Sequence, residues 1–302
     1  MKILVTGASG FLGKTLCPAL RARGWEVFET HSRDADLTRF GSLDKYNLIH
    51  FDRIYHLAAW TQAGDFCLYH PGEQWIINQQ INTHVLSWRH ERQPQAKLIS
   101  MGTSCSYEEG RELSEENYLR GSPIQGLYTY GMCKRMLHIG QMSLARQFGY
   151  KYLTVVPATL YGPGHHTDGR QMHFIFDLIR KIMLYKHRGE TVTLWGDGNQ
   201  RRELVFVSDF VDTLIALDER VENDLYNVGA GEDHTIREFA EMICKIAGVD
   251  SSDIRYDASK YVGAKSKMLS TKKLDALLPS RARTALHVGL EITITNFEQS
   301  LK

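Results

Sequence analysis

A tyrosine and a lysine four residues apart could carry out proton chemistry in this chain. Tyr130 and Lys134 lie in a stretch that we expect to form a helix ending at Gly149. Residues four apart share one face of a helix. The lysine charge would favour phenolate and lower the pKa of Tyr130, which would then serve as acid or base. On a solvated helix face the same pair would have no function, so its neighbours decide between the two interpretations.

A further reactive side chain follows an apolar stretch, residues 97–102, that we predict to be a strand. Parallel sheets bind their ligands at the carboxyl ends of the strands. There the hydroxyl of Thr103 could bond a reacting oxygen. Threonine after a strand also has an ordinary interpretation, as a turn residue. Together with the tyrosine and the lysine it indicates a site for proton and hydride transfer.

The first residues of the chain predict a binding site for a pyrophosphate. A short apolar strand at 2–6 is followed by a helix that begins near Phe11 and stops at Gly24. Three glycines are spaced three residues apart: Gly7, Gly10 and Gly13. Glycine lets the backbone approach the ligand, and the helix N-terminus offers free N–H groups. A tight turn with nothing bound is the alternative. Pro18, inside the helix, should kink or shorten it.

Charges near a second predicted strand, residues 25–30, bear on which dinucleotide would bind. An acid there would bond the ribose 2′-hydroxyl of NAD, whereas a cation would favour the 2′-phosphate of NADP. Glu29 and Arg33 both lie nearby, and arginine pairs with phosphate through two parallel hydrogen bonds. Arg33 therefore favours NADP(H), although it could be a solvated loop charge. A third predicted strand, 53–59, ends in small residues whose backbone could lie against the cofactor: Leu57, Ala58 and Ala59.

The composition excludes several classes of protein. The 302 residues carry 36 basic and 35 acidic side chains, for a net charge of +1, which argues against a nucleic-acid partner held by net charge. The five cysteines include no C-x-x-C pair, so we expect free thiols, a reducing compartment and no metal site. No signal peptide and no apolar run of about 20 residues are visible. We therefore expect a cytoplasmic protein with no membrane partner.

Alternating strands and helices predict an α/β fold with a parallel sheet covered on both faces. We expect a Rossmann-type, doubly wound domain over residues 1–160, with a return of the chain at about 204–230. A smaller C-terminal α/β domain over 161–203 and 231–302 would then hold the substrate.

The chain resembles a known family over nearly its whole length. Its signatures are T-G-A-S-G-F-L-G, H-L-A-A, T-S-C-S-Y, Y-x-x-x-K, Y-G-P-G and W-G-D-G-N-Q-R-R-E-L-V-F-V-S-D. These are similar to the extended short-chain dehydrogenases/reductases that act on nucleotide sugars, and within them to the GDP-L-fucose synthases. The resemblance implies NADP(H) as cofactor and a nucleoside-diphosphate sugar as substrate.

The resemblance also implies roles for individual residues. Catalysis would rest on Thr103, Cys105, Tyr130, Lys134 and His173. The cofactor would contact Gly7, Ser9, Gly10, Phe11, Leu12, Gly13, Arg33, Leu57, Ala58, Ala59, Tyr130 and Lys134. The substrate would contact Lys181, Trp195, Arg202 and Lys267. By the same analogy, a second apolar face on the helix of Tyr130 would pair two copies as a homodimer: Met136, Leu137, Met142 and Leu144.

Together these residues imply a 4-keto-6-deoxy sugar nucleotide as substrate. Its keto group would acidify the C3 and C5 protons, which Cys105 and His173 could remove and return, before Tyr130 protonates the C4 oxygen during reduction. If only one of Cys105 and His173 transfers protons, one centre is epimerised. If neither does, the chain is a plain 4-ketoreductase. The same motifs would also suit an NAD-dependent 4-epimerase or a non-catalytic nucleotide-binding protein. Differences from the family near residues 261–270 leave the base and the sugar open.

Overall fold

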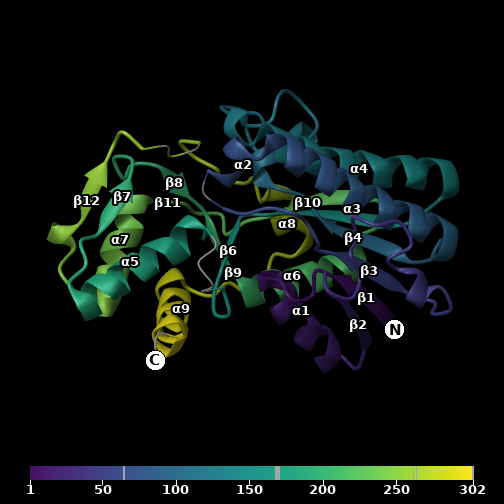
Figure 1. The fold of residues 1–302 in the computed structure, drawn as a ribbon, viewed down its shortest axis with the longest axis horizontal. Helices are drawn as coiled ribbons and strands as arrows, with labels where there is room; N and C mark the ends of the chain where they lie inside the picture. The colour runs from purple at the N-terminus through teal and green to yellow at the C-terminus, as the bar shows by residue number, and fades with distance from the viewer. Residues whose placement is uncertain (64, 167–170, 261, 263, 301–302) are drawn as a thin grey trace.

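The computed structural model describes residues 1–63, 65–166, 171–260, 262 and 264–300. Its centre is a six-stranded parallel sheet in the order β10-β5-β4-β3-β1-β2 (Figure 1). The strands are β1 (Lys2–Thr6), β2 (Glu26–Thr30), β3 (Arg53–His56), β4 (Lys97–Met101), β5 (Tyr152–Pro157) and β10 (Asp224–Val228). The chain therefore comes back to this sheet with β10, after a long excursion.

Both faces of the sheet are covered, as the alternation of side chains along β1 illustrates. Ile3 and Val5 are buried among residues of α1 (Phe11–Ala22) and α6 (Val207–Arg220). Leu4, on the opposite face, is buried against α3 (Pro71–Arg92). The remaining helix of this layer, α4 (Tyr128–Phe148), packs along α3, and the two lie across the sheet from α1 and α6 (Figure 1). The predicted doubly wound α/β fold is confirmed.

A second buried core lies toward the other end of the molecule (Figure 1). It is formed by α5 (Phe174–Arg188), α7 (Ile236–Ala247), α9 (Leu286–Ser300), β7 (Thr193–Trp195) and the first and last residues of β9 (Leu204–Phe206). The other short elements are α2 (Phe66–Tyr69), β6 (Thr159–Tyr161), β8 (Arg201–Arg202), β11 (His234–Thr235), β12 (Arg255–Asp257) and α8 (Lys272–Leu277). Within the described residues, no helix is both long and apolar enough to cross a membrane.

One stretch near the C-terminus packs on the first core, beside the sheet. Leu269, Leu274 and Leu278 fall in the range expected for the substrate domain, yet they are buried in the core beside α6 and the sheet. They carry α8 against β10, the edge strand. An edge strand gains from such a cover because its outer side is otherwise open to pairing with another chain.

Local sequence signals had mixed outcomes. The capping box at the start of α7 is present, with Thr235 and Glu238 bonding each other's backbone N–H groups. Helix α1 runs from Phe11 to Ala22, so the expectation that Pro18 would shorten it is wrong. Pro18 is exposed, so the carbonyl left without a helical partner can bond water instead.

A buried cluster of charged groups joins the sheet to α6. Asp218 is almost inaccessible and accepts hydrogen bonds from Arg53 Nε (2.9 Å) and Tyr55 Oη (2.8 Å). Lys97 Nζ lies 2.9 Å from the same carboxylate and donates to the carbonyl of Val221 (2.6 Å). Lys97 is also buried, and burial lowers its pKa while Asp218 opposes that shift. Removing the carboxylate would leave a buried cation without its counter-charge.

We therefore expect Asp218→Asn to lower the free energy of unfolding by about 3–5 kcal/mol, measured by urea denaturation. The control is Glu222→Gln, which breaks an ion pair with Lys151 whose side chains are both about half exposed. That change should cost less than about 1 kcal/mol. Equal losses in the two variants would contradict a structural role for the buried cluster.

Candidate active site

Tyr130 and Lys134 lie in the first two turns of α4 in different surroundings. Lys134 is buried, and burial lowers its pKa to about 8. Tyr130 is half-buried, and its pKa is raised by burial first and by the nearby Cys105 second. The predicted lowering of the tyrosine pKa is therefore wrong: desolvation dominates, and Lys134 Nζ lies 5.9 Å from the ring centroid. Tyr130 is a phenol at neutral pH, which suits it to donate a proton.

A short turn, Ser104–Ser106, brings the hydroxyl and the thiol to α4. Thr103 caps the turn, and its Oγ1 accepts a hydrogen bond from the Cys105 backbone N–H (3.3 Å). Ser106 Oγ donates to the carbonyl of Gly131 in the helix (3.0 Å). A Cβ on Gly131 would come within 2.9 Å of the Cys105 carbonyl oxygen. Glycine at this position lets the turn lie directly against the helix, beside the tyrosine.

Arg135, which sequence patterns gave no reason to select, holds the surrounding loop in place. Its guanidinium is buried and donates to the carbonyls of Gly121 (2.6 Å), Arg120 (2.8 Å) and Ser106. Three backbone carbonyls from two loop segments are thus fixed to the helix next to Lys134. The available signal was an arginine directly after the lysine of the Y-x-x-x-K motif, which periodicity alone does not distinguish from a surface charge.

Lys267, from a distant part of the chain, contacts Cys105. Lys267 Nζ donates to Cys105 Sγ across 3.4 Å. His173 stands at the N-cap position of α5. The residue is exposed to solvent, yet desolvation by nearby protein, followed by the charges of Lys267 and His166, lowers the pKa of His173. The imidazole is therefore neutral at pH 7, and Lys267 interacts both with it and with the thiol.

Two of the other residues predicted to hold the substrate, Lys181 and Arg202, already have protein partners. Lys181 Nζ lies 2.9 Å from an Asp177 carboxylate oxygen and donates to the carbonyl of Thr193 (3.1 Å). Arg202 donates to the carbonyls of Val262 (2.9 Å) and Ala264 (2.8 Å). Trp195, at the end of β7, is 43% exposed. Contact of Lys181 or Arg202 with a diphosphate stays a prediction, and it requires some of these hydrogen bonds to be exchanged.

The glycine-rich turn forms a tight cradle between β1 and α1. Gly7 has φ +68°, and a Cβ there would lie 2.8 Å from the backbone nitrogen of Ala58. A Cβ on Gly13 would lie 2.4 Å from the carbonyl oxygen of Ala8. The N-cap of α1 is Gly10, which offers no side-chain hydrogen bond, and the first turn holds no acid. The exposed N–H groups and positive end of this helix therefore fit the pyrophosphate of a dinucleotide.

The flanking residues of the cradle are placed as follows. Ser9 is exposed, and Leu57, Ala58 and Ala59 are half-buried beside it. Phe11 packs edge-on against Phe176 (5.4 Å between ring centroids). Leu12 packs on the core that contains α6. Phe11 thus ties the cradle to α5, the helix that begins beside His173.

Comparison with known proteins agrees with this geometry. Residues 3–229 match the NAD dependent epimerase/dehydratase family. The chain belongs to this family. It is 28% identical over 283 residues to the GDP-L-colitose synthase of Yersinia pseudotuberculosis, covering 91% of each chain. It is 29% identical over 293 residues to a GDP-L-fucose synthase of Azorhizobium caulinodans, covering 93% of this chain and 92% of the relative.

A solved structure shows the same fold. The GDP-L-fucose synthetase of Naegleria fowleri bound to NADP superposes with a TM-score of 0.86 at 21% identity, covering 99% of this chain and 94% of that one. The predicted resemblance to the nucleotide-sugar epimerases and reductases is confirmed.

In this epimerase/dehydratase family member, the two charges predicted to select the dinucleotide differ in their surroundings. Glu29 is paired with Arg21 of α1 at 2.6 Å, and His31 lies 3.8 Å from its other oxygen. Arg33 is exposed and makes no ion pair or hydrogen bond within the described chain. The carboxylate is thus already neutralised, whereas the guanidinium is available to an anionic ligand.

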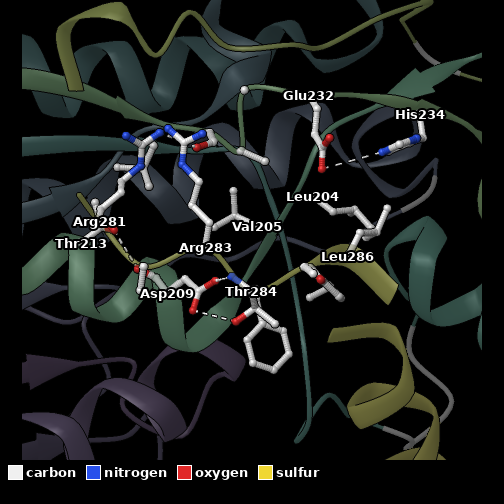
Figure 2. A pocket seen from close by; sticks show the side chains of 18 residues that line it. Leu204, Val205, Asp209, Thr213, Glu232, His234, Arg281, Arg283, Thr284 and Leu286 are labelled. Atoms are coloured by element: carbon white, nitrogen blue, oxygen red, sulfur yellow. Dashed lines mark hydrogen bonds and ion pairs between the residues drawn. The ribbon is translucent and has the colours of Figure 1, made fainter. Parts of the chain in front are cut away.

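A separate pocket of about 270 Å³ lies between α6 and the segment 281–286 (Figure 2). Its lining includes none of the predicted site residues. Its charged groups already have partners in the chain: Asp209 accepts from Thr284, and Arg281 and Arg283 pair with Asp275, which lies outside the lining. Among the described residues, no group of three His, Cys, Asp or Glu side chains could hold a metal ion.

The cradle predicts the effect of one added methyl group. Gly13→Ala should weaken NADPH binding about ten- to hundredfold, because the new Cβ forces the turn off the helix at a cost of about 1–3 kcal/mol. Quenching of protein fluorescence by NADPH measures this. The control is Gly72→Ala near the start of α3, where a Cβ would meet no atom within 4 Å. Equal NADPH affinities in the two variants would contradict binding of the cofactor at the glycine-rich turn.

Proposed function

We propose that this protein reduces the 4-keto group of a nucleoside-diphosphate 4-keto-6-deoxy sugar with NADPH, after epimerising C3, C5 or both. The observation that carries the proposal is the convergence of a protonated tyrosine with a thiol and a neutral histidine. Tyr130, Cys105 and His173 come from three segments of the chain, and the charge interactions of Cys105 and Lys267 connect them. GDP is the first nucleotide to test, because both relatives described above are named for GDP sugars.

Reduction would use the groups on α4 and the turn before it. The phenol of Tyr130 would donate its proton to the C4 oxygen, and the Thr103 hydroxyl would donate a hydrogen bond to the same atom. The cation of Lys134 would favour the tyrosinate left behind. NADPH, when bound, supplies the hydride. Thr103 can fill this role because the turn hydrogen bond uses only its acceptor capacity, leaving the O–H free to donate.

Epimerisation would use the two remaining groups. The 4-keto group acidifies the protons on its neighbouring carbons, so a modest base is sufficient to remove them. Cys105 would take such a proton, and His173 would return one to the opposite face of the ring. If only one of them acts, a single centre is inverted. If neither acts, the enzyme is a simple 4-ketoreductase.

Support for NADP(H) comes from the cradle and its flanks. The paired Glu29 and the available Arg33 favour a 2′-phosphate over a free 2′-hydroxyl. The structural neighbour bound to NADP has the same fold. A cofactor-retaining 4-epimerase would have no need of Cys105 and His173, and a binding protein would have no need of the tyrosine, lysine and threonine together.

Three broader predictions remain to be tested. A homodimer through α4 is supported by exposed Met136, Ile139 and Met142. Leu137, which was expected on that surface, is instead buried, so it lies on the inner side of α4. The cytoplasmic location and the division into cofactor and substrate domains also stay predictions.

The wild-type enzyme should oxidise one NADPH per sugar, which absorbance at 340 nm measures. In deuterated water, NMR should find deuterium at C3, C5 or both. Tyr130→Phe should slow NADPH oxidation by a factor of about 10²–10⁴, the usual contribution of a general acid. The control is Tyr128→Phe, in the same turn of α4 but 50% exposed, which should leave the rate unchanged.

The pattern of conversion distinguishes the candidate activities. Oxidation without ring deuterium would reduce the enzyme to a ketoreductase. Sugar conversion without NADPH consumption would identify a 4-epimerase. No conversion of any 4-keto-6-deoxy sugar nucleotide would contradict the proposal.

The pKa of Lys134 predicts a loss of activity in alkali. Because burial lowers that pKa to about 8, the lysine is cationic below pH 8 and neutral above it. Above pH 8 it can no longer favour the tyrosinate, so kcat/KM should fall. Arginine stays charged, so Lys134→Arg should move the alkaline limb of the pH profile to higher pH. If the alkaline limb stays at the same pH in this variant, it reports the titration of a group other than Lys134.

A further inference from the structure

The contact between Lys267 and Cys105 is unusual for a surface lysine. Lys267 makes no ion pair with a carboxylate in the part of the chain that the structure describes, and its ammonium donates to a sulfur instead (3.4 Å). The two residues are separated by 162 positions in the sequence. Lysine side chains lose considerable rotamer freedom when held, so this placement needs support from the segment that carries it.

That support comes from the segment 264–270, here called the strap. At its start, the carbonyls of Ala264 and Lys265 accept hydrogen bonds from Arg202 (2.8 Å) and from the backbone N–H of Arg201 (2.8 Å). At its end, the Leu269 N–H donates to the buried carboxylate of Glu203 (3.0 Å). Lys267 therefore lies in the middle of a short segment that is fixed at both ends.

The strap is also fixed to the Rossmann core. The Leu269 side chain is buried among residues of the sheet and α6. The Ser270 N–H donates to the carbonyl of Leu113 (3.0 Å). The backbone that carries Lys267 is therefore fixed within reach of Cys105.

Among the titratable groups that face the Cys105 sulfur, Lys267 supplies the positive charge. Cys67, Tyr118 and Tyr130 also face Cys105, and burial raises the pKa of each of them. All three are uncharged at neutral pH. His173, which the charge of Lys267 also affects, has a lowered pKa and is neutral as well. Lys267 alone in this set carries a positive charge when the site is at work.

We propose that Lys267 is a positioning residue that holds Cys105 as the thiolate and directs it toward the sugar ring. The inference rests on the proposed function and deepens it, because it names the group that makes the thiol a base. An ammonium beside a sulfur favours the thiolate, which is the form that accepts a proton. The role differs from simple attraction of a diphosphate, which would require no contact with sulfur.

The proposed proton transfer begins at Cys105. The Cys105 thiolate takes the ring proton and becomes a thiol, and the electron pair of the broken C–H bond forms an enolate at C4. The neutral imidazole of His173 takes a proton from solvent on one ring nitrogen as it gives the proton of the other to the opposite face of the same carbon, which restores the ketone. The thiol then releases its proton to solvent and returns to the Lys267 ammonium.

Alkylation of Cys105 tests the contact without any substrate. Iodoacetamide reacts with thiolates, and peptide mass spectrometry follows Cys105 separately from the buried thiols Cys17, Cys67, Cys133 and Cys244. Lys267→Met should slow alkylation of Cys105 at pH 7 about tenfold. Lys267→Arg should restore much of the rate, because it keeps the charge.

The matched control is Lys265→Met, which removes the same charge from an exposed position of the strap. Cys105 should react at the wild-type rate in this variant. Equal rates in the wild type and in Lys267→Met would overturn the proposal, as would an equal loss in both methionine variants. Thermal unfolding of each variant confirms that it is folded before the comparison.

A second measurement separates this proposal from the proposed function. With a converted sugar nucleotide, Lys267→Met should slow deuterium entry into the ring about tenfold while KM for the sugar changes little. A raised KM with unchanged exchange would mean that Lys267 only binds the diphosphate, which would overturn the inference. If the wild type converts no 4-keto sugar, the proposed function fails, and the alkylation result still decides whether Lys267 activates Cys105.

Discussion

The close approach of one turn to one helix underlies the whole candidate site. The turn Ser104–Ser106 can rest on α4 because Gly131 has no side chain to meet the Cys105 carbonyl. Ser106 and Arg135 then join the two elements through hydrogen bonds to backbone carbonyls. A larger residue in place of the glycine would push the thiol and threonine away from the tyrosine. The chemistry of the site thus depends on a contact that involves no reactive group.

Burial sets the protonation states that the proposed chemistry needs. Tyr130 stays a phenol and Lys134 has its pKa lowered to about 8, since both are removed from water on the inner side of α4. Desolvation opposes the charged form of each residue, so it raises one pKa and lowers the other. In the strap, Lys267 escapes the deepest burial and remains the cation beside Cys105. Desolvation thus keeps the phenol of the proposed reaction protonated, while Lys267 lies closer to solvent, in contact with Cys105.

Several features could be predicted from the sequence because their causes are local. The strand–turn–helix of the cradle follows from an apolar run and three glycines, and the Thr235 capping box follows from residues three positions apart. The shortening of α1 expected from Pro18 does not occur, because the cost of a helical proline depends on exposure, which a helical pattern alone does not reveal. Leu137 was placed on the wrong face of α4 for a similar reason: α4 is apolar on both sides, and the neighbouring elements decide which side is inner.

By itself, the sequence determined the α/β class, the phosphate cradle and the residue types of the site, since periodicity, glycine spacing and the Y-x-x-x-K motif act over a few residues. Only the tertiary structure decided how these residues meet. It placed Lys267 on Cys105 across 162 positions and returned residues 269–278 to the first core. It also reversed the expected shift of the Tyr130 pKa. Long-range contacts and desolvation arise only when distant segments pack together, and no local pattern records them.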